Sequence, residues 1–153
     1  MNLLIFSRPG IRIYQELRRS ETAWHALRFY NPLEIPVGIF IQVSSLSAAL
    51  SLASDLKYFI RKYGAEHLFE ISKGLYCTAT FATGRYTTRE KLPDPWPWKL
   101  WYWVVGDGTI LKTQTPPGSI SQVKTTQGGY LFEVICTEEE FSVHQYVHPD
   151  KEQ

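Results

Sequence analysis

The sequence predicts a single α+β domain over residues 1–153, with an antiparallel meander sheet of about five or six strands packed against N-terminal helices. Three observations predict this class. The chain has the length of one ordinary domain. Apolar residues in 46–63 recur at the three-and-four spacing of an amphipathic helix. Beyond Leu68, short apolar or alternating segments are separated by turns that contain glycine.

The first thirty or so residues are predicted to form one short strand and then helices. Residues 2–6 are typical of a strand, and residues 11–30 of one helix or two short ones. Ser20 is available as an internal N-cap. Pro32 pushes the residue before it out of the helical region, so the helical segment ends there.

A buried strand and the main helix follow. Residues 36–44 are a β-branched run, and Ser44 or Ser45 then caps the helix predicted over 46–63. Residues 35–54 carry no charge and are long enough to cross a bilayer. Their proline, glycine and serines favour a strand followed by a helix, so we predict no membrane span.

The second half is predicted to form the meander. Asp107-Gly108 and Gly128-Gly129 are typical hairpin turns, and the first loop can hold two or three residues, which shifts the cross-strand partners by one. The predicted strand pairs are 75–82 with 86–90, 100–106 with 109–115, and 120–127 with 130–137.

The C-terminal segment fits two patterns. Thr137 and Glu140 have the spacing of a helical capping box, whereas residues 141–147 alternate as a strand does, and we favour the strand. On a helix His144 and His148 could share a metal ion, but a strand separates them by about 13 Å. Because a third ligand is also missing, we predict no metal site.

Composition and charge restrict the functional classes. The net charge is +1, yet residues 1–62 carry eight Lys/Arg and four acids, and the remainder eight Lys/Arg and eleven acids. The two halves can simply attract one another, or the first can offer a basic face to an acidic partner. Cys77 and Cys136, the only cysteines, are predicted to be buried core residues. With no signal-peptide pattern, they favour a cytoplasmic location.

No catalytic or cofactor motif stands out. The strand at 36–44 enters its helix without the glycines that bind a dinucleotide. The glycines of the later turns are explained by hairpin geometry. No nucleophile elbow or close acidic pair is present either. We therefore name no catalytic residue and no cofactor, and an enzyme is not the favoured class.

Four tryptophans lie within eight positions. Pro95 and Pro97 prevent the segment around Trp96 and Trp98 from pairing inside a sheet, so we expect it to be extended on the surface. Trp101 and Trp103 face one side of the next strand. The opposite face is predicted to pack on the helix of 46–63, and its residues are Leu100, Tyr102 and Val104. Something must cover the tryptophan face, since a half-open sheet normally carries polar residues there. The cover can be the segment 94–98 folded back, the N-terminal helix, a bound ligand or another protein.

We therefore predict a non-catalytic cytosolic protein-interaction module, an adaptor or assembly factor, that binds another protein or a second copy of itself. The predicted contact residues are Trp96, Trp98, Trp101, Trp103, Lys99 and Lys112. Replacing Trp96 and Trp98 by alanine should then weaken partner binding and leave thermal stability nearly unchanged.

Two alternatives stay open. A small enzyme or carrier could hold an apolar ligand in an aromatic-lined pocket, with Tyr102, His67 or His144 for acid–base work. Single-stranded nucleic-acid binding would need aromatic rings to lie beside a basic surface. Nucleic acid is the less favoured partner, because only Lys99 and Lys112 lie close to the clustered tryptophans. The fold would have to bring a further set of cations to these rings: Arg18, Arg19, Arg28 and Lys57.

Overall fold

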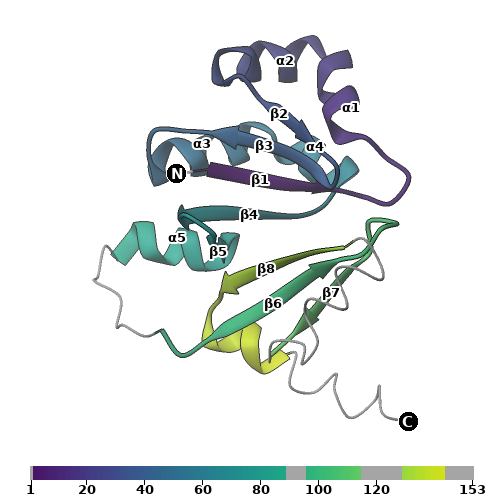
Figure 1. The fold of residues 1–153 in the computed structure, drawn as a ribbon. Coiled ribbons are helices and arrows are strands. Elements are labelled where there is room, and N and C mark those ends of the chain that lie inside the picture. Colours follow the sequence, from purple (N-terminus) through teal and green to yellow (C-terminus); the bar gives the residue numbers. More distant parts are fainter. Residues whose placement is uncertain (1, 89–95, 115–128, 144–153) are drawn as a thin grey trace.

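The computed structural model describes residues 2–88, 96–114 and 129–143, and these form an α+β fold (Figure 1). The elements are β1 (Asn2–Ser7), α1 (Ile13–Arg19), α2 (Glu21–Leu27), the 3₁₀ helix η1 (Arg28–Tyr30), β2 (Leu33–Ile35), β3 (Gly38–Gln42), α3 (Leu46–Asp55), α4 (Lys57–Tyr63), β4 (Gly64–Ser72), β5 (Leu75–Thr78), α5 (Ala79–Thr88), β6 (Lys99–Val104), β7 (Ile110–Thr113) and β8 (Tyr130–Ile135).

The sheet is mixed, so the predicted antiparallel meander is only partly right. The described strands form one eight-stranded sheet in the order β2-β3-β1-β4-β5-β8-β6-β7. Strands β5 and β8 are parallel, with Tyr76 opposite Val134, whereas the other neighbours are antiparallel. The β6–β7 hairpin and α5 lie between β5 and β8 in the chain, which gives the long connection that parallel neighbours require.

Strand β1 lies inside the sheet and is buried on both faces. Leu3 and Ile5 belong to the core under the helices, and Leu4 and Phe6 to a second core on the other face. A strand covered on both sides needs no polar alternation. The apolar run of residues 2–6, predicted as a strand, is confirmed.

The helices of the first half cover the first core. The Ser20 hydroxyl accepts a hydrogen bond from the Ala23 amide (3.2 Å) and caps α2, as predicted. The Ser45 hydroxyl caps α3 in the same way. The predicted main helix of 46–63 is interrupted at Leu56, where φ −94° and ψ 9° leave helical geometry, so it forms two helices, α3 and α4.

The predicted hairpin around Gly84 is wrong, because a helix occupies this region. Strand β5 ends at Thr78. The Thr78 hydroxyl accepts a hydrogen bond from the Phe81 amide (3.1 Å) and so caps the start of α5. The neighbouring residues Phe81 and Ala82 are both buried in the helical core. A helix can turn two adjacent side chains toward one core, whereas a strand points them to opposite faces.

The second core forms where the sheet bends and β6 and β8 approach β1 and β4. Phe6 and Phe132 meet edge to face with ring centroids 5.2 Å apart. The predicted buried face of β6 is confirmed, and its members are Leu100, Tyr102 and Val104. They pack with Leu4, Phe6 and Leu68 in this second core. The prediction that they pack on the helix of 46–63 is therefore wrong.

The β6–β7 hairpin has a three-residue loop. The Val105 amide donates to the Thr109 carbonyl (2.9 Å), and Gly108 has φ +95°, which glycine tolerates best. Tyr102 therefore lies opposite Lys112, and the register expected from a two-residue loop is wrong.

The segment after β8 turns into a helix at residues 138–143, so the favoured strand is wrong. The Glu140 amide donates to the Thr137 hydroxyl (3.2 Å), and the Thr137 amide donates to the Glu140 carboxylate (3.0 Å). This capping box satisfies two amides that a strand would need to pair elsewhere. His144, His148 and the predicted strand 120–127 lie outside the described residues. Within those residues no helix is long and apolar enough to cross a membrane.

Candidate functional site

The first pair of clustered tryptophans lies against the protein itself. The Trp96 indole nitrogen donates to the Cys136 carbonyl (2.9 Å), and its ring contacts Phe81 and Trp98 at 5.4 and 5.3 Å between centroids. Trp96 packs on the helical core and Trp98 on the second core. Both indoles are therefore partly buried and have partners within the chain.

The second pair lies on the face of β6 opposite Tyr102. Trp103 is flanked by Leu111 of β7 and Leu131 of β8, and Trp101 by Thr113 and Glu133. Both tryptophans are half-buried.

Both predicted contact lysines are already paired. Lys99 forms an ion pair with Glu133 at 2.7 Å, and Lys112 with Glu66 at 2.8 Å. The Lys112 ammonium also lies 4.9 Å from the centre of the Tyr102 ring. The six predicted contact residues therefore do not share one face, because Lys112 lies with Tyr102 on the side of the sheet away from Trp101 and Trp103. Both lysines are also neutralised by an acid of the same chain.

Tyr102 and His67, the described residues of the enzyme alternative, do not come together. Tyr102 lies in the second core, whereas His67 contacts Phe69 edge to face on the helical side of the sheet. Burial, with a smaller contribution from Glu66, raises the pKa of Tyr102, and burial lowers the pKa of His67. A sheet separates the two groups, so they cannot exchange a proton directly.

Cys77 and Cys136 are core residues, as predicted. Neither side chain is exposed to solvent. Burial raises the pKa of each thiol to about 12, and the Glu140 carboxylate adds to the rise. A nucleophilic cysteine needs the opposite shift, toward the thiolate.

We expect neither thiol to react with DTNB in the folded protein at pH 8. A pKa of about 12 leaves roughly one thiol in ten thousand ionised at that pH, and burial blocks the reagent. In guanidinium chloride two thiols per chain should be titrated. Rapid reaction of either thiol without denaturant would contradict its placement in the core.

Helices α1 and α2 expose a different set of side chains. The buried face of α1 carries Ile13 and Leu17, and that of α2 carries Ala23 and Leu27. The Ser20 cap turns the chain between these two short helices. Their outer faces and η1 then carry the arginine–tryptophan surface, which we define as Arg18, Arg19, Trp24, Arg28 and Phe29.

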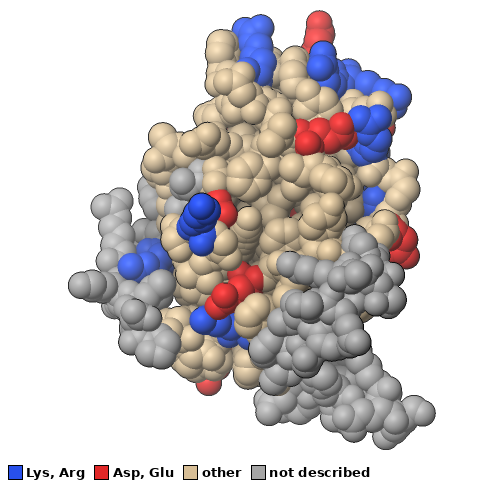
Figure 2. All heavy atoms as spheres, in the orientation of Figure 1, with Lys and Arg blue, Asp and Glu red and all other residues tan. Residues whose placement is uncertain are grey.

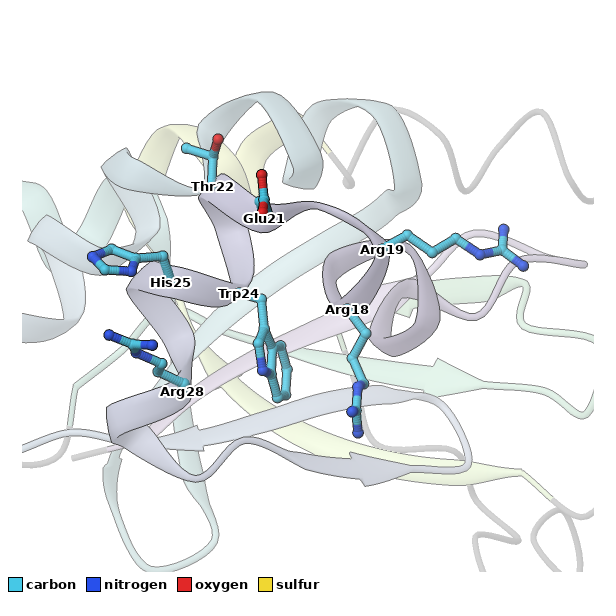
Figure 3. Close-up of a pocket in the computed structure, with 7 residues that line it drawn as sticks. All are labelled: Arg18, Arg19, Glu21, Thr22, Trp24, His25 and Arg28. Carbon is cyan, nitrogen blue, oxygen red and sulfur yellow. The ribbon is translucent and has the colours of Figure 1, made fainter.

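Arginine and aromatic side chains alternate on this surface. The Arg18 guanidinium carbon lies 4.9 Å from the Trp24 ring centre and 5.9 Å from that of Tyr14. Arg28 lies 4.7 Å from the ring centre of Phe29, which is 75% exposed. Figure 3 shows the Trp24 indole between the side chains of Arg18 and Arg28.

Two hollows run along this surface. One, of about 620 Å³, is bordered by α1, α2 and Arg28 and is the hollow drawn in Figure 3. A second, of about 380 Å³, extends past Tyr14 to Arg12. Arg18 and Arg19 border both hollows, so the two lie side by side.

The cations of this surface are only partly neutralised. Arg12 forms an ion pair with Glu34 (2.6 Å), and Arg19 with Glu16 (3.1 Å). Arg18 and Arg28 have no ion pair within the described part of the chain. In Figure 2, Lys and Arg side chains gather at the end of the molecule formed by α1 and α2.

Helix α4, which packs against α1, has a second group of cations and rings. The Lys62 ammonium lies 5.6 Å from the centre of the Tyr58 ring and 5.3 Å from that of Tyr63. Tyr58 is 61% exposed. Lys57 and Arg61 add two further charges, and α4 contains no acid. Helix α4 therefore carries a second group of positive charges beside α1.

Sequence reasoning found the charge of this surface and missed its rings. The excess of Lys/Arg in residues 1–62 was evident, but Trp24 stood apart from the tryptophan cluster. The usable signal was the i,i+4 spacing of Tyr14 with Arg18 and of Trp24 with Arg28, which puts ring and cation on one helix face. The contact of Arg18 with Trp24 joins two helices and is visible only in the fold.

Comparison with known proteins found no relative. No family model matches the chain, and neither the search of curated proteins nor that of solved structures gave a match. A functional proposal therefore rests on the side chains themselves.

Proposed function

We propose that this chain is a non-catalytic interaction module that binds an anionic partner through the arginine–tryptophan surface. The observation that carries the proposal is the environment of the Arg18 side chain. Its guanidinium is exposed, lies over the Trp24 ring and forms no ion pair within the described residues, although Glu21 borders the same hollow. Arg28 repeats this arrangement on Phe29.

The chemistry of arginine supports an anionic ligand. A guanidinium presents a planar fork of donors that matches carboxylate or phosphate oxygens, and it is always charged. Stacking on an indole orders the side chain before the ligand arrives, so less conformational entropy is lost on binding. The two adjacent hollows give such a ligand room beside the cations.

Docking through the tryptophan segment has less support. Trp96 already donates to a backbone carbonyl, and the two nearby lysines already form ion pairs. We therefore place the contact surface on α1, α2 and η1. A cytosolic location stays part of the proposal, because two buried, unpaired thiols suit a reducing compartment.

The test measures binding of two fluorescein-labelled polyanions, oligo-dT and poly-glutamate, by anisotropy in about 50 mM salt. We expect the wild-type chain to bind at least one of them. Arg18→Gln should weaken that binding about tenfold, whereas Lys73→Gln, which removes the same charge from the exposed turn between β4 and β5, should change it little.

Two results would count against the proposal. One is no binding of either polyanion at this low salt. The other is equal loss of affinity in Arg18→Gln and Lys73→Gln, which would mean that net charge alone attracts the polymer.

A further inference from the structure

We propose that the partner is single-stranded nucleic acid, with phosphates on the arginines and bases stacked on the exposed rings. This inference rests on the proposed function and names its ligand. The juxtaposition that carries it is ring beside cation, twice on the arginine–tryptophan surface and again on α4.

The rings separate nucleic acid from an acidic polypeptide. Carboxylates would form ion pairs with the guanidinium groups of Arg18 and Arg28 but would make no contact with the faces of the aromatic rings. Phe29 and Tyr58 are 75% and 61% exposed, so both rings are accessible to a base. Bases stack on aromatic rings and on guanidinium planes, so one nucleotide can use both members of a pair.

The shape of the surface favours an extended, unpaired strand. The two hollows lie side by side along α1 and have Arg18 and Arg19 as common borders. A duplex keeps its bases stacked on one another, so its backbone could use the arginines but its bases could not use Phe29. Single strands expose base faces, and a positive track with aromatic platforms is how they are held without sequence preference.

Charge distribution is consistent with this ligand. Residues 12–30 and 57–63 together contain seven Lys/Arg and two acids, although the whole chain has a net charge of only +1. A phosphate backbone is attracted by such a local excess and is repelled by the acidic remainder of the chain. The attraction should therefore be local and should fall steeply with salt.

The experiment compares ligands of equal length and differing chemistry. Fluorescein-labelled oligomers of about 20 units would be titrated by anisotropy in about 50 mM salt: oligo-dT, oligo-U, an abasic deoxyribose-phosphate strand, a DNA duplex and poly-glutamate. We expect oligo-dT or oligo-U to bind at least about tenfold more tightly than the abasic strand. The dT and U arms show whether the natural strand is DNA or RNA.

Two variants locate the contacts. Phe29→Ala should weaken oligo-dT binding about tenfold, leave abasic-strand binding unchanged and leave the melting temperature unchanged, because Phe29 is largely exposed. Tyr130→Ala, which removes an exposed ring from β8, is the matched control. Arg18→Gln should make the slope of log K against log salt shallower by about 0.7, the value for one phosphate contact on a single strand.

Distinct results overturn this inference and the proposed function. Equal binding of abasic strand and oligo-dT, or an affinity for duplex as high as for single strands, would exclude stacking and overturn the inference alone. Tighter binding of poly-glutamate than of either oligonucleotide would assign the surface to an acidic protein. No binding of any of the five ligands would overturn both.

Discussion

Replacing Phe6 by alanine is expected to lower the free energy of unfolding by about 3–5 kcal/mol. Phe6 is fully buried on β1, and its ring packs edge to face on Phe132 of β8. It therefore joins the N-terminal strands to the C-terminal ones across the bent sheet. Truncation would leave a cavity between two strands that are far apart in sequence. Urea denaturation followed by circular dichroism measures the loss.

Phe6→Leu and Leu33→Ala serve as controls. The first keeps most of the buried volume and should cost less than about 1.5 kcal/mol. The second removes an apolar side chain that is 60% exposed on β2 and should change stability little. A loss below about 1 kcal/mol in Phe6→Ala would show that the two parts of the sheet do not pack as described.

Trp96→Ala is expected to have the second largest effect, a loss of about 2–4 kcal/mol. The substitution removes a half-buried indole from between Phe81 and Trp98 and leaves the Cys136 carbonyl without its donor. This expectation reverses the one drawn from sequence, in which Trp96 was a surface contact residue. Thermal unfolding measures it directly.

Trp96→Phe separates packing from hydrogen bonding. Phenylalanine keeps an aromatic ring but has no donor, so most of the packing should remain and the loss should be about 1 kcal/mol for the hydrogen bond. If Trp96→Ala instead unfolds at the wild-type temperature, the indole does not support the fold, and the tryptophan segment becomes the better candidate for a contact surface.

Local patterns predicted the local structure well. Ser20 and Ser45 were recognisable as caps because their hydroxyl groups bond to amides three residues along the chain. The buried face of β6 followed from the two-residue period of a strand. Errors occurred where two local patterns competed. Around Thr78 the alternating apolar pattern predicted a strand, but an N-cap there begins a helix. The same happened at Thr137, where a capping box begins a helix.

The candidate site was predictable only in part. The basic excess of the first half needs nothing more than counting. The partners of the clustered tryptophans and lysines were not predictable, because Lys112 meets Glu66 and Trp96 meets Cys136 over long sequence separations. The same holds for Arg18, whose ring contact with Trp24 depends on the angle between two short helices.

The sequence by itself determined the α+β class, the helical character of the first half, the buried thiols and the location of positive charge. These properties follow from residue spacing and composition within a few turns of chain. Only the tertiary structure decided that β5 and β8 run parallel, that Trp96 and Trp98 pack on their own chain, and that Trp24 lies beside Arg18. Those outcomes depend on which distant surfaces meet. Because the hydrophobic effect is non-directional, the local sequence of an apolar segment does not specify which other segment it will pack against.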